Sequence, residues 1–342
     1  MRLIKQIIWA LLGLALIMAA LIGWWVQSPL NLPSSLPTAT VDLSIETQTP
    51  VKGIAQAVAD AGVEVNPTAL YVFFRLSGES RKLRAGSYEL TQGTTPLDLL
   101  RKLSRGEESL KAVSLIDGWT FPQFRAALAK AEGLKHDTQN MSDEEIMLKL
   151  GMAGVPAEGR FFPDTYTYGK GSSDVRVLQR AAKAMNKQLA AAWKQRDSGI
   201  QVNSPEEALI LASIVEKETG RESDRTTISR VFHNRLAIDM PLQTDPTVIY
   251  GLGPSFDGDL RRSDLRTDHP WNTYTRKGLP PTPIAMPGRA ALKAAVQPAE
   301  SNALYFVARG DGSSVFSATL EAHNAAVNRY QRRMGGSASE AK

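Results

Sequence analysis

The sequence predicts an α+β protein in which a single N-terminal membrane helix is followed by two globular parts. Three observations lead to this prediction. An apolar run occupies residues 7–26, short strand-like and helix-like segments follow up to about residue 108, and helices separated by long irregular segments fill the remainder. With 342 residues, of which 43% are hydrophobic, the chain is long enough to form two or more domains, each with its own core.

The N-terminal segment predicts a membrane anchor. Residues 7–26 contain no charged or strongly polar side chain, and a helix of this length crosses the apolar core of a bilayer. Arg2 and Lys5 precede the run and the next basic residue is Lys52, so the positive-inside rule places residues 1–6 in the cytoplasm and the later domains outside it. A cleaved signal peptide is the alternative, although the run is longer than a usual signal core.

Composition narrows the class of protein. The chain has no cysteine and its four histidines form no His-x-x-x-His pair, so we expect no disulfide and no metal site. No Walker loop, dinucleotide fingerprint or calcium loop occurs, so we expect no cofactor. The formal net charge is +5, but no basic run alternates with aromatic residues, so nucleic acid is not the expected partner. A mildly basic surface also suits an enzyme that acts on an anionic polymer or near anionic lipids.

Two regions precede the largest part of the chain. Residues 27–40 carry three prolines among polar residues and predict an extended stalk. Residues 41–108 predict a compact unit with the order strand, helix, helix, strand and an appended helix. The predicted elements span 41–46, 51–61, 67–76, 83–90 and 95–105. Their order resembles the LysM-type module, which binds glycan chains.

Residues 109–334 form the expected main domain, and residues 335–342 are rich in Ser, Gly and Ala and are expected to be disordered. Helices are predicted over 121–134, 142–150 and 174–197. A non-helical segment over 159–166 is dense in aromatic residues and predicts a turn that faces the core.

The next helix is the most informative segment of this domain. Ser204, Pro205 and Glu207 predict its start, with Ser204 as the cap and Glu207 completing a capping box. Gly220 is the expected stop. Between these signals the helix is apolar around nearly its whole circumference, which predicts that it is buried in a domain.

Two acids stand at the end of this helix. Glu218 lies one turn after Ile214 and Val215, so its carboxylate shares a face with bulky apolar groups, whereas Glu216 follows two small residues. Because desolvation disfavours the charged form, Glu218 is the better candidate for a proton donor near neutral pH. The alternative is that both acids are ordinary charges that pair with neighbouring basic residues.

Downstream, a helix over 224–237 is predicted to pack against the acidic helix, after which the chain is expected to be irregular. Three segments of this irregular part, 242–251, 272–274 and 278–288, are rich in amides, hydroxyls, Tyr rings and prolines. Such loops suit a sugar-binding cleft because they offer planar hydrogen-bonding groups and flat aromatic faces. Ordinary turns are the alternative.

Several separated segments resemble the endolytic murein transglycosylases of the YceG-like type. In chain order they are Phe162-Pro-Asp-Thr-Tyr166, Ala212-Ser-Ile-Val-Glu-Lys-Glu218-Thr, Leu242-Gln-Thr-Asp-Pro-Thr-Val-Ile-Tyr-Gly251, Asn272-Thr-Tyr274 and Gly278-Leu-Pro-Pro281. The resemblance covers essentially the whole chain, including the N-terminal helix and the LysM-like unit. It implies a single-pass protein of the inner cell membrane with a periplasmic catalytic domain, which acts on peptidoglycan glycan strands near penicillin-binding synthases.

The resemblance also implies the reaction. The bond between N-acetylmuramic acid and N-acetylglucosamine would be cleaved within the strand by a lyase route that leaves 1,6-anhydro ends, which would limit the elongation of nascent strands. The catalytic acid of the family corresponds to Glu218. The residues expected to line or support the substrate cleft are Gln243, Asp245, Tyr250, Asn272 and Tyr274. Two alternatives remain open: a noncatalytic glycan-binding scaffold and a hydrolytic muramidase.

Overall fold

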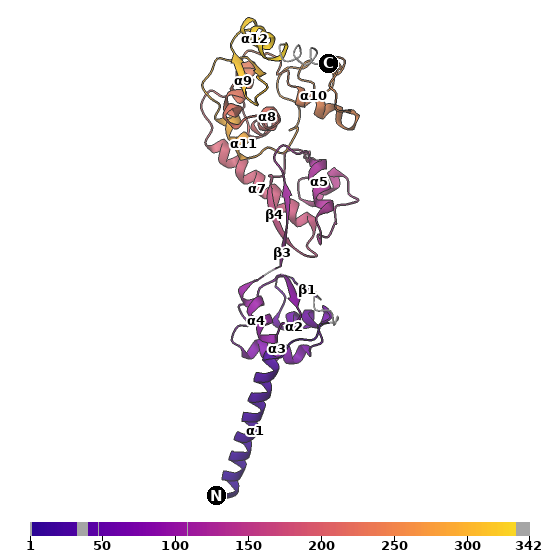
Figure 1. The fold of residues 1–342 in the computed structure, drawn as a ribbon, viewed down its shortest axis with the longest axis vertical. Helices are drawn as coiled ribbons and strands as arrows, with labels where there is room; N and C mark the ends of the chain where they lie inside the picture. The colour runs from indigo at the N-terminus through magenta and orange to yellow at the C-terminus, as the bar shows by residue number, and fades with distance from the viewer. Residues whose placement is uncertain (1, 33–39, 47, 108, 333–342) are drawn as a thin grey trace, which may run out of the picture. The chain divides into compact units, whose positions relative to one another are not determined.

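The computed structural model describes residues 2–32, 40–46, 48–107 and 109–332, and the predicted disordered tail lies outside them. The described chain mixes helices with three small two-stranded sheets, so the predicted α+β class is confirmed (Figure 1). It forms two compact units, each with its own hydrophobic core. The first comprises residues 1–112, 131–135 and 167–173, and the second comprises residues 113–130, 136–166 and 174–342.

Helix α1 (Arg2–Gln27) agrees with the predicted apolar segment. Its Trp9–Gln27 portion is long and apolar enough to cross a membrane, judged by length and composition. The side chains of Trp9, Leu16 and Trp24 are more than two-thirds exposed, which water alone would disfavour. A membrane anchor and a signal sequence both satisfy this test.

The first unit contains the predicted order of strand, helix, helix, strand and helix. Strands β1 (Thr40–Ile45) and β2 (Gly86–Thr91) pair antiparallel, with Val41 opposite Leu90 and Leu43 opposite Tyr88. All four of these side chains are buried, because alternate residues of a strand face the same side. Helices complete the core; these are α2 (Val51–Asp60), α3 (Pro67–Leu76) and α4 (Pro96–Arg105).

The start of the predicted stalk, residues 28–32, packs against the first unit, so the prediction of an extended stalk is wrong for these residues. Leu30 and Leu32 are 5% and 8% exposed and belong to the core of the first unit. The Leu30 amide donates to the Thr94 carbonyl at 2.8 Å. Packing these two leucines removes more apolar surface from water than an extended linker could. The central part of the predicted stalk, residues 33–39, lies outside the described residues.

Three segments beyond residue 108 belong to the first unit, at 109–112, 131–135 and 167–173. The Gly171 amide donates to the Gly133 carbonyl at 2.7 Å, and the Lys135 amide donates to the Ser172 carbonyl at 2.8 Å. Helix α5 (Phe121–Lys130) consequently ends four residues before its predicted end. Strand β3 (Leu110–Leu115) pairs with β4 (Asp164–Gly169), a strand that sequence patterns did not predict.

Helix α8 (Pro205–Glu218) lies in the core of the second unit. It contacts α7 (Asp174–Lys194), α9 (Arg225–Ala237) and α11 (Arg289–Val296). Every residue from 208 to 215 is buried, which confirms the predicted buried helix and its packing against α9. The remaining elements are α6 (Asp143–Lys149), α10 (Asp245–Leu252), β5 (Tyr305–Ala308), β6 (Ser314–Ser317) and α12 (Leu320–Val327).

Candidate active site

Helix α8 starts as predicted and ends slightly earlier than predicted. The Ser204 hydroxyl accepts from the Glu207 amide at 3.1 Å, but the Glu207 carboxylate accepts from the Asn203 amide at 2.7 Å, so only half of the capping box forms. At the other end Thr219 is extended and its hydroxyl donates to the Val215 carbonyl at 2.6 Å. The stop is therefore Thr219 instead of Gly220, and Glu218 is the last helical residue.

Glu218 is half-buried and is hydrogen bonded by a side chain. The Thr244 hydroxyl donates to Glu218 Oε1. Burial raises the pKa of Glu218; the Thr244 hydrogen bond and the charge of Arg235 oppose this shift, while the negative charge of Asp245 adds to it. The net direction is upward, so the carboxyl retains its proton to higher pH than an ordinary Glu. Such a group is suited to general acid catalysis.

Three threonines connect the two predicted loop segments beside Glu218. The Thr244 amide donates to Thr273 Oγ1 at 3.1 Å, and the Thr247 hydroxyl donates to the Thr244 carbonyl at 2.7 Å. The hydroxyls of Thr247 and Thr273 lie 2.8 Å apart, and the Gln243 amide donates to the Thr273 carbonyl at 3.0 Å. The structure thus brings segments 242–251 and 272–274 together at the end of α8.

Arg235 of α9 is a buried cation near the acid. Its Nε donates to the Leu304 carbonyl at 2.7 Å and its Nη1 donates to the Leu242 carbonyl at 2.5 Å. These backbone contacts fix the guanidinium, whose charge lowers the pKa of Glu218. Sequence reasoning missed Arg235, because a single basic residue in an amphipathic helix carries no signal that it is buried.

Three of the predicted cleft residues lie around the acid. The Tyr274 hydroxyl donates to Asp245 Oδ1 at 2.5 Å, and the charge of Asp245 acts on Glu218. Gln243 is exposed and has a φ of 48°, a left-handed conformation that is unfavourable for a residue with a side chain. Asp245 is also exposed, so Gln243 and Asp245 form a solvent-facing edge next to the buried threonines.

Tyr250 faces inward. Its hydroxyl forms hydrogen bonds with the side chains of Glu158 and Thr282, and its ring packs edge-to-face against Trp271 at a centroid distance of 5.7 Å. Glu158 is 5% exposed and accepts hydrogen bonds from the Phe121 amide at 3.1 and 3.2 Å. Burial raises the pKa of Glu158 to about 7. This buried acid was not predicted, since its partners are distant in the sequence.

Asn272 serves the loop that contains it. It is fully buried, and its amide nitrogen lies within hydrogen-bonding distance of the carbonyls of Asp264, Leu265 and Thr267, at 3.2, 3.2 and 2.7 Å. Its Oδ1 accepts from the Tyr274 amide at 2.9 Å. Both ends of the side chain are therefore occupied by backbone groups, and Asn272 holds the position of Thr273 beside it.

Glu216 is also buried, contrary to the simple contrast that its small neighbours suggested. Its side chain is 9% exposed, and Oε2 accepts from the Gly288 amide at 2.9 Å. Arg225 Nη2 lies 3.9 Å from Oε1. Burial raises the pKa of Glu216, and the Gly288 hydrogen bond opposes this shift. A Cβ atom at Gly288 would lie 2.6 Å from an Asp117 oxygen, so a side chain there would force a local rearrangement.

The segment predicted as irregular contains a helix. Helix α10 begins at Asp245, with Thr244 at the cap position and Pro246 in the first turn. Both signals are present in the sequence and are typical of a helix start. The predicted irregular segment is wrong here, because the nearby Gly, Thr and Tyr residues favour loops and outweigh these two helix-start signals in the local composition.

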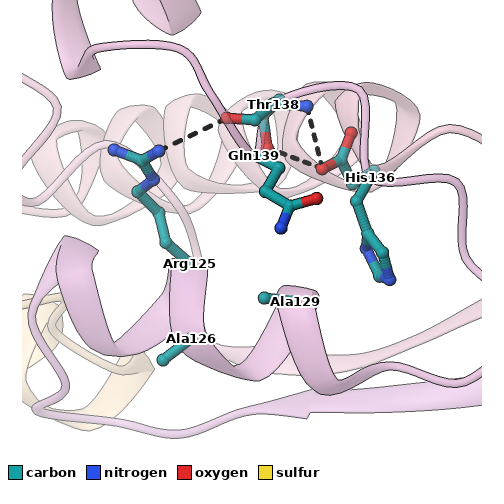
Figure 2. Close-up of a pocket in the computed structure, with 7 residues that line it drawn as sticks. Arg125, Ala126, Ala129, His136, Thr138 and Gln139 are labelled. Carbon is teal, nitrogen blue, oxygen red and sulfur yellow. Dashed lines mark hydrogen bonds between the residues drawn. The ribbon is translucent and has the colours of Figure 1, made fainter.

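A second candidate site is a cavity of about 200 Å³ (Figure 2), lined by Arg125, Ala126, Ala129, His136, Thr138, Gln139 and Asp174. Asp174 is buried, and one of its oxygens accepts from the Thr138 amide and hydroxyl at 3.2 and 2.6 Å. Asp174 thereby attaches the turn that contains Thr138 to the first turn of α7.

The described residues contain no group of three or more His, Cys, Asp or Glu side chains that could hold a metal.

Comparisons with known proteins converge on one family. The YceG-like family profile matches residues 43–329. An endolytic murein transglycosylase from Bacillus subtilis (strain 168) is 32% identical over 310 residues, covering 85% of this chain and 85% of that protein. One from Streptococcus pneumoniae (serotype 2, strain D39) is 28% identical over 302 residues, covering 78% of this chain and 54% of that protein. The crystal structure of a yceG-like protein from Listeria monocytogenes covers 84% of this chain and 99% of its own, with a TM-score of 0.54 and 29% identity.

Proposed function

This chain belongs to the YceG-like family, and we propose that it acts as an endolytic murein transglycosylase. The reaction is cleavage of the bond between N-acetylmuramic acid and N-acetylglucosamine within peptidoglycan glycan strands, with a 1,6-anhydro-muramic end as product. One observation carries the proposal. Glu218, at the end of a buried helix, is a carboxyl whose pKa is raised by burial and which a side-chain hydroxyl orients.

Glu218 serves as acid and then as base. Its carboxyl proton passes to the glycosidic oxygen as the bond between that oxygen and C1 of the muramic residue breaks. The 6-hydroxyl oxygen of the same muramic residue bonds to C1, and its proton passes to the Glu218 carboxylate. The residue ends protonated, as it began, and no water is consumed. Because the nucleophile belongs to the substrate, its effective concentration is far above that of an external molecule.

The surroundings of the other acids favour this route over hydrolysis. A glycoside hydrolase ordinarily uses a second carboxylate, either to activate water or to attack the sugar. Glu216 contacts the scaffold through the Gly288 amide, which favours the route with a single acid, whereas Asp245 accepts the Tyr274 hydroxyl with one oxygen and stays exposed to a substrate hydroxyl. We assign Gln243, Asp245 and Tyr274 to substrate contact. Tyr250 and Asn272 hold the loops, because their polar atoms face protein partners.

The proposal extends to location and to the first unit. The apolar α1 and the basic residues before it support a single membrane anchor with residues 1–6 in the cytoplasm and the domains in the periplasm. The order of β1, α2, α3 and β2 supports a LysM-like module that binds the glycan strand. An anchored enzyme of this kind would meet nascent strands close to penicillin-binding synthases and limit their elongation.

The test is the chemistry of the new strand ends. The full-length protein in detergent is incubated with uncrosslinked glycan strands, and products are analysed by mass spectrometry. The proposal predicts new muramic ends that are one water lighter than reducing ends. Reducing ends would instead identify a muramidase. Binding without cleavage, in a preparation whose circular dichroism shows a folded protein, would identify a scaffold.

A further inference from the structure

For three buried threonines beside Glu218, the contacts determine the acceptor to which each hydroxyl donates its hydrogen. Thr244, Thr247 and Thr273 are at most 2% exposed, so water does not complete their hydrogen bonding. A threonine hydroxyl carries one hydrogen and can accept in addition. Because a buried hydroxyl without an acceptor is costly, each of the three hydrogens has to be directed at a protein acceptor.

Each of the three hydroxyl hydrogens can be assigned to one acceptor. The Thr247 hydroxyl uses its hydrogen on the Thr244 carbonyl, 2.7 Å away, which cannot donate. The 2.8 Å contact between Thr247 and Thr273 is then donated by Thr273, whose oxygen also accepts from the Thr244 amide. For the Thr244 hydroxyl the acceptor is Glu218 Oε1, and no other acceptor contacts it in the described part of the chain.

This direction decides which oxygen of Glu218 can carry the acid proton. A proton on Oε1 would be donated to Thr244, and the hydrogen of Thr244 would then have no acceptor. Oε1 therefore accepts from Thr244 whether the carboxyl is protonated or ionised. Resting on the proposed role of Glu218 as the acid, we propose that Thr244 is a positioning residue that keeps the catalytic proton on Oε2.

The backbone around Thr244 supports a positioning role. Thr244 occupies the cap position of α10, where a threonine hydroxyl ordinarily accepts from an amide of the first turn, yet it makes no such bond. Its hydroxyl is directed to Glu218 instead. The preceding residue, Gln243, holds an unfavourable left-handed φ of 48°. Local strain and a forgone cap are typical of a position shaped by function.

Two consequences follow for the reaction. The glycosidic oxygen receives its proton from Oε2, and the proton of the 6-hydroxyl returns to the same atom. The Thr244 hydrogen bond also stabilises the carboxylate that exists between these two transfers, since hydrogen bonds to charged acceptors are stronger than those to neutral ones.

Thr244→Val tests the proposal, because valine is similar in shape and lacks the hydroxyl. Cleavage of uncrosslinked strands by the full-length protein in detergent is followed from about pH 4 to about pH 9. We expect kcat to fall about tenfold or more, with KM within about twofold, since a hydrogen bond to a charged group is lost. The pH at which the rate falls on the alkaline side should rise by about one unit, because the carboxylate loses a donor.

Two further variants make the test specific. Thr244→Ser keeps the hydroxyl. It should restore both the rate and the pH at which the rate falls on the alkaline side, here called the alkaline limb. Thr275→Val removes a hydroxyl of the neighbouring loop that donates to Asp268 at 2.9 Å, and should change neither quantity. If Thr244→Val does not fold by circular dichroism, Thr244→Ala replaces it with the same expectation.

The outcomes separate this inference from the proposed function. A wild-type protein that yields no anhydro ends overturns the function itself. If the wild type cleaves and a folded Thr244→Val protein keeps the wild-type alkaline limb, the proposal for Thr244 is wrong. A lower rate with an unchanged alkaline limb would likewise overturn it, since that result indicates a purely structural role.

Discussion

Glu216 and Glu218 lie two residues apart in the last turn of α8, and their carboxylates accept hydrogen bonds from different kinds of donor. Glu216 accepts from a backbone amide, that of Gly288 at the start of α11. Glu218 accepts from the side-chain hydroxyl of Thr244. Both contacts join α8 to the start of another helix, α11 for Glu216 and α10 for Glu218. A backbone amide can only donate, whereas a hydroxyl can donate or accept, so the direction of the Glu218 contact depends on the other partners of the Thr244 hydroxyl.

Glu158 extends the comparison, because it too accepts from a backbone amide at a helix start, that of Phe121. Burial raises the pKa of all three carboxyls. A raised pKa therefore does not by itself identify the catalytic acid in this protein. The type of donor distinguishes them: backbone amides at helix starts hold Glu158 and Glu216, whereas a side-chain hydroxyl holds Glu218.

The largest expected effect comes from exchanging each α8 acid for its amide. Glu218→Gln should lower the cleavage rate by about 10² to 10⁴-fold, which is the usual contribution of a general acid. Glu216→Gln keeps an acceptor for the Gly288 amide and should leave the rate within about threefold. Rates are measured as anhydro ends formed per unit time. A comparable loss in both variants would remove the distinction between the two acids.

Glu158 supplies a test through stability. Its pKa is about 7 in the folded protein against 4.5 for an ordinary Glu, so the folded state holds this proton to higher pH. Its contribution to stability is therefore full below about pH 4.5 and is lost as the pH rises to about 7, which amounts to about 3 kcal/mol. Glu158→Gln should remove that part of the pH dependence.

The measurement is urea unfolding followed by tryptophan fluorescence across this pH range. Glu300→Gln, at an exposed position, is the control. If the difference in unfolding free energy between wild type and Glu158→Gln were constant with pH, Glu158 would not be the buried acid that the Phe121 contact indicates.

The sequence predicts Glu218 as the acid but does not predict which residue holds its carboxyl. Helix periodicity and the start signal at Ser204 predict a buried α8, although the predicted stop at Gly220 lies beyond its last residue, Glu218. The segments 242–251 and 272–274 were also correctly expected to belong together. Within them, however, the prediction names Gln243 and Asp245, whereas the intervening Thr244 contacts Glu218. Which of three consecutive polar residues faces Glu218 depends on the left-handed turn at Gln243, which local patterns do not reveal.

Long-range contacts explain the remaining differences. Glu216 was expected to differ from Glu218 because its neighbours in the helix are small. Its burial depends instead on Gly288, 72 residues later, and that pairing leaves no trace in helix periodicity. In the same way, Leu30 and Leu32 are surrounded by linker-like residues but pack into the first unit, where tertiary contacts override local composition.

Asn272→Ala should show whether Asn272 supports the loop beside Glu218 or contacts the substrate. The substitution leaves a buried amide and nearby carbonyls without partners, so we expect a loss of about 2 kcal/mol in unfolding free energy. Asn272→Asp keeps the acceptor for the Tyr274 amide but places a buried carboxylate against backbone carbonyls, so it should not recover the loss. Unfolding in urea provides the measurement. A stable Asn272→Ala protein with a raised KM would instead indicate direct contact with the sugar.

The smallest expected effect concerns charge near the acid. Asp245 is negatively charged and raises the pKa of Glu218, so Asp245→Asn should lower that pKa. Since Glu218 acts in its protonated form, the alkaline limb of the rate should move to lower pH, by about half a unit for an exposed charge. The shift should shrink at high salt, and Asp257→Asn, which removes an exposed acid paired with Arg261, should cause none.

The shift expected for Asp245→Asn is opposite in direction to that expected for Thr244→Val, because one substitution removes a repelling charge and the other removes a stabilising donor. Equal shifts of the same sign in both variants would mean that the surroundings of Glu218 respond as a whole, and that donor and charge do not act on the carboxyl separately.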